Sequence, residues 1–241
     1  MIIIGCSNSK KLAQKTANTL KVPYSDLELK NSHNGEMHIK FNHNLKNQTV
    51  LLFQSLYPHP NHSLLELLFA AETAKDLGAK KIILIIPYFA FLTEEYRKED
   101  GEGINSKIIC SLLNKTADEI ITIDTNQDIS NLFTIPFHNL SSAELLKDYI
   151  KKNFTDYALI APDKNASSLV KHISNKFITL DKKRIHEHKV EINDSLDLEH
   201  KNIILIDDII NTGTTMSSAI SCLKNKHNIY CITVHPILAG N

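Results

Sequence analysis

The segment NIILIDDIINTGTTMS, residues 202–217, constrains the fold of this chain more than any other. Residues 203–206 form a continuous aliphatic run, which is typical of a parallel strand covered on both faces. Two adjacent carboxylates, Asp207 and Asp208, then stand at the expected strand tip, and a Thr- and Gly-rich turn leads into a helix. Open α/β sheets bind ligands at the carboxyl ends of their strands, so the segment predicts a binding site here.

The residue types of this segment indicate a phosphorylated sugar as the ligand. Carboxylates at a strand end accept hydrogen bonds from vicinal hydroxyls or face a hydrated Mg²⁺. Backbone N–H groups and hydroxyls in a turn at a helix N-terminus bind phosphate. An ordinary strand, turn and helix with a Thr N-cap is the alternative, but it would not require paired carboxylates. The candidate ligand-binding residues are Asp207, Asp208, Asn211, Thr212, Gly213, Thr214 and Thr215.

Strand-like runs alternate with amphipathic helix patterns along the rest of the chain, which predicts an α/β fold with mostly parallel sheets. Strands are expected over residues 2–5, 49–54, 81–86, 119–123, 157–161, 177–180, 203–206 and 229–234. Helices are expected over residues 10–20, 63–77, 104–114, 142–152, 167–175 and 215–225. The pattern divides into two domains, residues 1–138 and 139–241.

Composition excludes several classes of partner. Lys plus Arg and Asp plus Glu both number 27, and a net charge of zero provides no field that favours nucleic acid or a membrane surface. There is no run of about 18 apolar residues, and the N-terminus lacks the basic start of a signal peptide. These features predict a cytoplasmic protein with neither nucleic-acid nor membrane partners.

The segment IDDIINTGTT resembles the binding signature for phosphoribosyl pyrophosphate (PRPP) in the phosphoribosyltransferase fold. The whole chain resembles the ribose-phosphate pyrophosphokinase (PRPP synthetase) family, and the matching segments include Asn34-Gly35-Glu36, Ile86-Pro87-Tyr88, Pro162-Asp163 and the run DKKR at 181–184. The resemblance implies two phosphoribosyltransferase-like three-layer domains. It also implies transfer of the diphosphoryl group of ATP to C1 of ribose 5-phosphate, Mg²⁺ as the cofactor, and a homo-oligomer.

The resemblance also implies roles for individual residues. Lys182 and Arg184 would be catalytic, because alternate residues of an extended loop point to the same side and together could clamp the transferring group. A solvated charge run is the alternative. Asp163 follows strand 157–161 and would bind Mg²⁺, although an Asp at this point is also an everyday helix cap.

On the ATP side the chain departs from the family pattern. Ser32 stands where the family has an aromatic residue that stacks on adenine, Asn34 replaces an Asp, and Asn126 lies near the position of a family His. Two other functions therefore stay open: a catalytically weak paralogue with a binding or regulatory role, and a phosphoribosyltransferase that consumes PRPP. The residues expected to bind ATP are Asn34, Glu36, Arg97 and Lys98.

Overall fold

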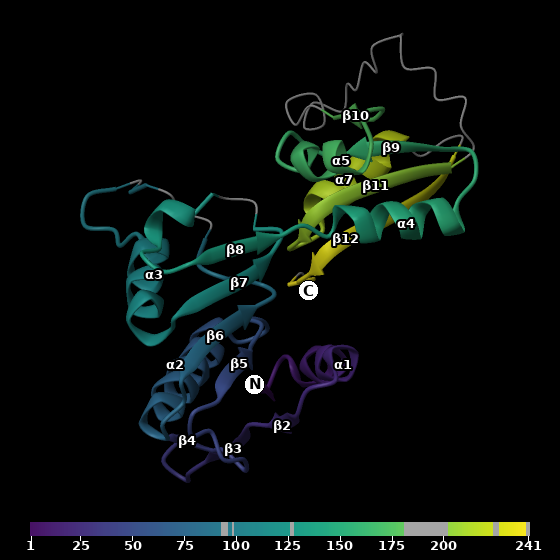
Figure 1. The fold of residues 1–241 in the computed structure, drawn as a ribbon. Helices are drawn as coiled ribbons and strands as arrows, with labels where there is room; N and C mark the ends of the chain where they lie inside the picture. The colour runs from purple at the N-terminus through teal and green to yellow at the C-terminus, as the bar shows by residue number, and fades with distance from the viewer. Residues whose placement is uncertain (93–95, 98, 126–127, 181–201, 224–226, 240–241) are drawn as a thin grey trace. The chain divides into compact units, whose positions relative to one another are not determined.

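The computed structural model describes residues 1–92, 96–97, 99–125, 128–180, 202–223 and 227–239. The chain forms two compact units, Met1–Leu140 and Ser141–Asn241. In each unit a parallel sheet lies between layers of helices (Figure 1). The predicted α/β fold class with mostly parallel sheets is confirmed.

The first unit is built on a six-stranded parallel sheet in the order β2-β1-β5-β6-β7-β8. Its strands are β1 (Ile2–Gly5), β2 (Tyr24–Asp26), β5 (Thr49–Phe53), β6 (Lys81–Ile86), β7 (Glu119–Ile123) and β8 (Phe137–Leu140). Its helical segments are α1 (Lys10–Leu20), α2 (Pro60–Asp76), α3 (Asn105–Thr116) and the short 3-10 helix η1 (Ser130–Leu132). A separate antiparallel hairpin consists of β3 (Glu28–Asn31) and β4 (Met37–Lys40).

Crossover direction places the helices of the first unit on opposite faces of its sheet. The connections β5-α2-β6 and β6-α3-β7 advance in one direction along the sheet, whereas β1-α1-β2 advances in the other. Right-handed crossovers therefore put α2 and α3 on one face and α1 on the other, as Figure 1 shows. The α2–α3 face contains the larger core, and α1 packs on its own face through Ala13 and Ala17.

The second unit has a four-stranded parallel sheet in the order β10-β9-β11-β12. Its core has two parts, because α4 and α5 pack on one face of the sheet and α7 packs on the other. The strands are β9 (Tyr157–Ala161), β10 (Ile178–Thr179), β11 (Asn202–Ile210) and β12 (Asn228–Pro236). The helices are α4 (Ala143–Asn153), α5 (Ser167–Ile173) and α7 (Thr214–Leu223).

A buried polar network ties the segments that follow β1 and β5 to α2 in the first unit. The carboxylate of Glu66 on α2 is fully buried, and it accepts hydrogen bonds from Ser7 N (2.8 Å), Ser7 Oγ (2.5 Å) and Gln54 Nε2 (2.6 Å). The amide oxygen of Gln54 in turn accepts a hydrogen bond from Asn8 N (3.0 Å). Burying a carboxylate costs free energy unless the group is hydrogen-bonded, and these donors offset that cost for Glu66.

We expect Glu66→Ala to lower the free energy of unfolding by about 3 kcal/mol, because it leaves buried donors on Ser7 and Gln54 without an acceptor. Thermal and urea denaturation of the full chain would measure the loss. Glu72→Ala is the matched control, since Glu72 lies on the same helix with its side chain 57% exposed. Equal destabilisation by the two substitutions would contradict the role given to Glu66.

Candidate functional site

Strand β11 carries the paired carboxylates of the second unit. Its ladder with β9 ends at Leu205, which pairs with Ile160, but its ladder with β12 continues to Ile210. Asp207 and Asp208 therefore lie inside the strand, and the prediction that they stand at its tip was wrong. The strand is longer than its aliphatic run because β12 supplies backbone partners beyond that run.

Asp207 is a buried acid in a cluster of negative charge. The residue is only 8% exposed, and its Oδ1 accepts a hydrogen bond from Asp208 N at 3.0 Å. Burial, with further contributions from Asp208 and from the charge of Asp163, raises the pKa of Asp207 to about 8. Near pH 7 the group is therefore largely protonated and can donate a hydrogen bond to a ligand oxygen.

Asp208 offers an acceptor that the described part of the chain does not use. Its Oδ2 is buried and has no hydrogen-bond partner among the described residues. The main chain is held in place by a hydrogen bond from Thr233 Oγ1 to Asp208 O (3.1 Å). A buried carboxylate oxygen without a donor is unfavourable, so the position suits a ligand that brings hydroxyl groups or metal-bound water.

The turn after β11 presents hydroxyls at the start of α7. Thr212 Oγ1 and Thr214 Oγ1 lie 2.9 Å apart, and Thr214 N donates weakly to Thr212 Oγ1 at 3.4 Å. Gly213 has φ +81°, a backbone conformation that favours glycine, and the space around it is open, since a Cβ there would meet no other atom within 4 Å. Ala239 N donates to Asn211 O (2.8 Å) and fixes the turn against the end of the chain. Thr215 follows in the first turn of α7, whose N–H groups can bind an anion.

Asp163 follows β9, the neighbour of β11, and is 7% exposed. Its Oδ1 accepts hydrogen bonds from Asn165 N (2.9 Å) and Ala166 N (3.2 Å), which is the geometry of a turn cap. Its charge also acts on Asp207, which places the two carboxylates in the same cluster. In the described part of the chain, no group of three or more His, Cys, Asp or Glu residues is arranged to hold a metal ion.

The residues expected to bind ATP lie in the first unit. Asn34 and Glu36 are in the turn between β3 and β4, where Asn34 Oδ1 accepts hydrogen bonds from Glu36 N (3.3 Å) and from Ser32 Oγ. Gly35 adopts φ +85° in the same turn. Arg97 is exposed. Three of the expected site residues, Lys98, Lys182 and Arg184, lie outside the described residues.

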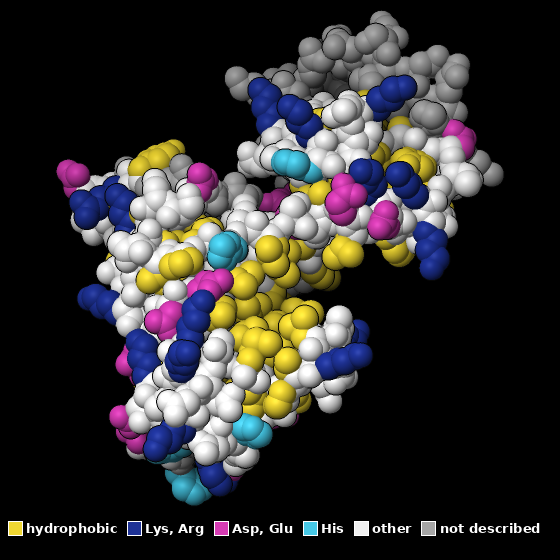
Figure 2. Space-filling view, viewed as in Figure 1, with side chains coloured by type: hydrophobic (Ala, Val, Ile, Leu, Met, Phe, Trp, Pro, Cys, Tyr) yellow, Lys and Arg dark blue, Asp and Glu magenta, His cyan; other side chains and the backbone are white. Residues whose placement is uncertain are grey.

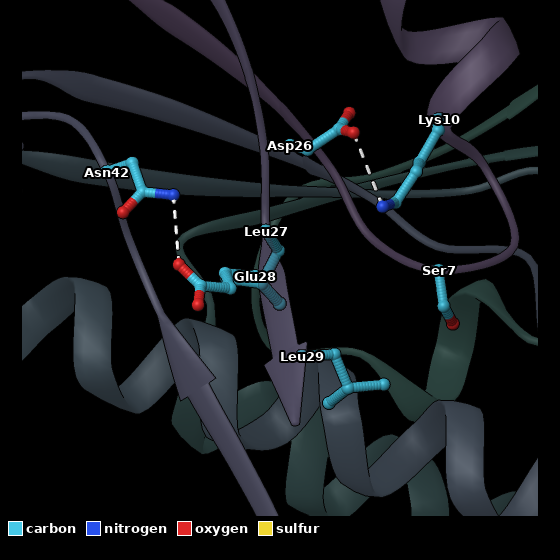
Figure 3. A pocket seen from close by; sticks show the side chains of 7 residues that line it. All are labelled: Ser7, Lys10, Asp26, Leu27, Glu28, Leu29 and Asn42. Atoms are coloured by element: carbon cyan, nitrogen blue, oxygen red, sulfur yellow. Dashed lines mark hydrogen bonds and ion pairs between the residues drawn. The ribbon is translucent and has the colours of Figure 1, made fainter. Parts of the chain in front are cut away.

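A cavity of about 540 Å³ lies at the base of this hairpin (Figure 3). Its charged side chains are paired with polar neighbours: Lys10 Nζ lies 3.3 Å from Asp26 Oδ2, and Asn42 Nδ2 donates to Glu28 Oε2 at 3.2 Å. The cavity was not foreseen from the sequence, because its lining comes from separate segments without a shared motif. The lining residues are Ser7, Lys10, Asp26, Leu27, Glu28, Leu29 and Asn42.

The raised pKa of Asp207 predicts a pH-dependent stability. Its ordinary pKa is 3.8 and its folded value is about 8, so the folded state holds a proton that the unfolded chain releases. This contribution is fully present below pH 4 and is lost as the pH rises through 8. The melting temperature of the wild type, measured without Mg²⁺, should therefore fall between pH 5 and 9 relative to that of Asp207→Asn. The control is Asp148→Asn, at an exposed carboxyl on α4, whose melting temperature should depend on pH as that of the wild type does. If the melting temperatures of the wild type and of Asp207→Asn changed in parallel with pH, the raised pKa of Asp207 would be refuted.

Comparison with known sequences covers both units. The sequence profile of the N-terminal domain of ribose phosphate pyrophosphokinase matches residues 1–116, and that of the phosphoribosyl transferase domain matches residues 128–240. A ribose-phosphate pyrophosphokinase of Methanothermobacter thermautotrophicus is 35% identical over 98% of this chain and 86% of its own length. One of Methanobrevibacter smithii is 32% identical over 99% of this chain and 87% of its own length.

The fold has a counterpart among solved structures. The crystal structure of phosphoribosylpyrophosphate synthetase from Mycobacterium smegmatis matches 99% of this chain and 83% of its own chain, with a TM-score of 0.79 and 22% sequence identity.

Among the described helices, none is long and apolar enough to cross a membrane.

Proposed function

The chain belongs to the ribose-phosphate pyrophosphokinase family, and we propose that the carboxylates and Thr turn of its second unit bind ribose 5-phosphate for diphosphoryl transfer from ATP. The observation that carries the proposal is the buried Asp208 Oδ2, which has no described donor, beside an open Thr-Gly-Thr turn at the start of α7. A phosphorylated sugar fits both features, since its hydroxyls donate and its phosphate accepts.

Within this site the sugar hydroxyls would face Asp207 and Asp208, and the 5-phosphate would lie against Thr212, Gly213 and Thr214. Asp207, protonated near pH 7, would donate to a ring or hydroxyl oxygen, and the unpartnered Asp208 Oδ2 would accept from a hydroxyl. Asn211 brings an amide, which can hydrogen-bond the sugar without adding to the negative charge of the cluster.

Mg²⁺ would need only one or two carboxylates of this cluster as ligands. This ion is usually held by one or two carboxylates together with substrate phosphates and water, so a complete protein cage is not required. Asp163 is the residue we propose as its ligand, since it stands in the same cluster as Asp207. When bound with ATP, the ion would supply positive charge that neutralises the phosphate oxygens.

The reaction is the attack of the C1 hydroxyl oxygen of ribose 5-phosphate on the β-phosphorus of ATP. The bond between this phosphorus and the oxygen that bridges it to the α-phosphate breaks, AMP leaves, and the hydroxyl proton is released. Phosphoryl transfer of this kind depends mostly on positioning and charge neutralisation. Lys182 and Arg184 would provide the cations, with Arg184 bidentate, while Asn34, Glu36, Arg97 and Lys98 would contact ATP.

One observation favours a second candidate, a catalytically weak relative with a binding or regulatory role. The side chain of Asn34 is hydrogen-bonded within its own turn, and Ser32 leaves no aromatic ring there to stack on adenine. The third possibility, a phosphoribosyltransferase that consumes PRPP, is less well supported, because residues 1–116 match the N-terminal domain of ribose phosphate pyrophosphokinase.

The experiment that separates these functions is AMP formation from Mg-ATP, measured with and without ribose 5-phosphate. Sugar-dependent AMP release supports the pyrophosphokinase. Binding of ribose 5-phosphate without AMP release would support the weak relative. Consumption of PRPP only in the presence of an acceptor base would support the transferase.

A further inference from the structure

Residues 237–239, which follow β12, fold back onto the end of β11. Their three backbone N–H groups all donate to carbonyl oxygens there. The bonds are Ile237 N to Ile210 O (3.0 Å), Leu238 N to Ile210 O (3.0 Å) and Ala239 N to Asn211 O (2.8 Å). The ladder between β11 and β12 ends at the pair of Ile210 and Pro236, so these bonds lie beyond the regular sheet.

The 237–239 segment has a backbone conformation that needs an explanation. Leu238 has φ +51°, in the left-handed region that side chains other than glycine adopt only at a cost in free energy. Burial of this side chain does not offset the cost, because Leu238 is 63% exposed. Strained backbone of this kind persists where the surrounding contacts hold it, and it is found most often at functional sites. The contacts that hold it here are the hydrogen bonds to the end of β11.

These hydrogen bonds orient the peptide groups that begin the Thr-Gly-Thr turn. In a planar trans peptide the N–H points opposite to the C=O. Hydrogen bonds to Ile210 O and Asn211 O therefore also fix the direction of the N–H groups of Asn211 and Thr212. Among the described residues, nothing accepts a hydrogen bond from the backbone N–H of Thr212 or Gly213. Both groups are thus available to a ligand.

The turn has few other anchors. The hydroxyls of Thr212 and Thr214 bond to each other, and Gly213 O accepts a hydrogen bond from Ser217 N on α7 (2.8 Å). Within the part of the chain that the structure describes, Ala239 is the sole residue outside β11 and α7 that hydrogen-bonds to residues 211–214. The position of the turn therefore depends on the 237–239 segment.

We propose that residues 237–239 are positioning residues for the 5-phosphate of ribose 5-phosphate. They do not touch the ligand; they hold the turn so that its free N–H groups face the phosphate oxygens. This inference rests on the proposed function of the second unit. The sugar hydroxyls are assigned instead to Asp207 and Asp208, and Asp207 is held by its ladder pair Thr233 on β12. Loss of the segment's hydrogen bonds should thus weaken the phosphate contacts and spare the hydroxyl contacts.

Ala239→Pro tests the role of the segment. Proline has no N–H to donate, and it also disfavours the left-handed conformation of the preceding residue, Leu238. The dissociation constant of ribose 5-phosphate, measured by calorimetry on the full-length chain, should rise about tenfold. In the reaction, KM for ribose 5-phosphate should rise by the same factor while kcat stays within about twofold, because the bound phosphate restores the turn. Ala239→Ser keeps the N–H and should restore the affinity of the wild type.

The control for a general loss of stability is Ile150→Val on α4. This helix packs against the sheet through Ile150, which is 1% exposed, and presents charged side chains on its outer side (Figure 2). The substitution should lower the melting temperature without changing the dissociation constant of ribose 5-phosphate. Equal affinities of Ala239→Pro and the wild type would overturn the positioning role, and so would an equal loss of affinity in Ile150→Val. A wild type that does not bind ribose 5-phosphate would overturn the proposed function, and this inference with it.

Hydrogen exchange provides a second test, because coupling between two sites is reciprocal. If the segment positions the phosphate turn, then ribose 5-phosphate must stabilise the segment in return. Saturating ribose 5-phosphate should slow exchange of the N–H groups of Leu238 and Ala239 in the wild type, although neither group contacts the ligand. Unchanged exchange at these two positions in the saturated protein would overturn the inference.

Discussion

Lys182→Ala should lower the rate of ribose 5-phosphate-dependent AMP formation about a thousandfold. The reason is electrostatic: the diphosphoryl group gains charge on its oxygens as it leaves the α-phosphate, and a positioned ammonium stabilises that charge in the transition state. The same substitution should leave the dissociation constant of ribose 5-phosphate almost unchanged, since this residue is assigned to the ATP-derived group. Initial rates and calorimetric titration with the sugar phosphate would measure the two effects separately.

The control for charge alone is Lys151→Ala on α4, which removes an exposed lysine from the same unit. Its rate should equal that of the wild type. If Lys182→Ala kept the full rate, the proposal that Lys182 and Arg184 together clamp the transferring group would be contradicted. If it lost sugar binding in proportion to the rate, Lys182 would belong to the ribose 5-phosphate site instead.

Asp208→Ala should raise the dissociation constant of ribose 5-phosphate about a hundredfold. The substitution removes the acceptor Oδ2, for which the sugar hydroxyls would be the donors, and hydrogen bonds to a charged group contribute about 1.5–3 kcal/mol each. Calorimetry or displacement of a bound sugar phosphate would measure the change.

The stability of Asp208→Ala should not fall in parallel. Oδ2 has no described partner, so the described contact that the substitution removes is the side-chain hydrogen bond of Asp208 with Asp207. Asp148→Ala, at an exposed carboxyl on α4, controls for net charge and should bind like the wild type. Unchanged affinity in Asp208→Ala would exclude this carboxylate from the sugar site.

The sequence was sufficient for features that are encoded locally. The aliphatic run at 203–206 predicted a buried parallel strand, and the Thr-Gly-Thr turn predicted the start of a helix, which begins at Thr214. The extension of β11 through Asp207 and Asp208 could not be predicted, since adjacent carboxylates look like a loop until β12 supplies a backbone ladder. Edge strands β2 and β8 were missed for a related reason, because they are short and polar.

Features that depend on contacts between residues far apart in the chain could not be predicted from the sequence. Glu66 sits in an ordinary Leu-Leu-Glu-Leu-Leu helix pattern, and its burial is intelligible only once Ser7 and Gln54 are brought to it. Asp163 could be read as a cap or a metal ligand. The structure shows a turn in which Asp163 accepts hydrogen bonds from Asn165 N and Ala166 N, whereas the N-cap of α5 is Ala166, and the metal role stays a prediction.

The central claim is that the diphosphoryl group passes intact from ATP to C1 of the sugar. Incubation of the purified full-length chain with Mg²⁺, ribose 5-phosphate and ATP labelled separately at the α-, β- or γ-phosphorus tests it most directly. We predict that the β and γ labels both appear in one sugar product, attached at C1, and that the α label appears only in AMP. Transfer of the γ label alone, with formation of ADP, would contradict the account.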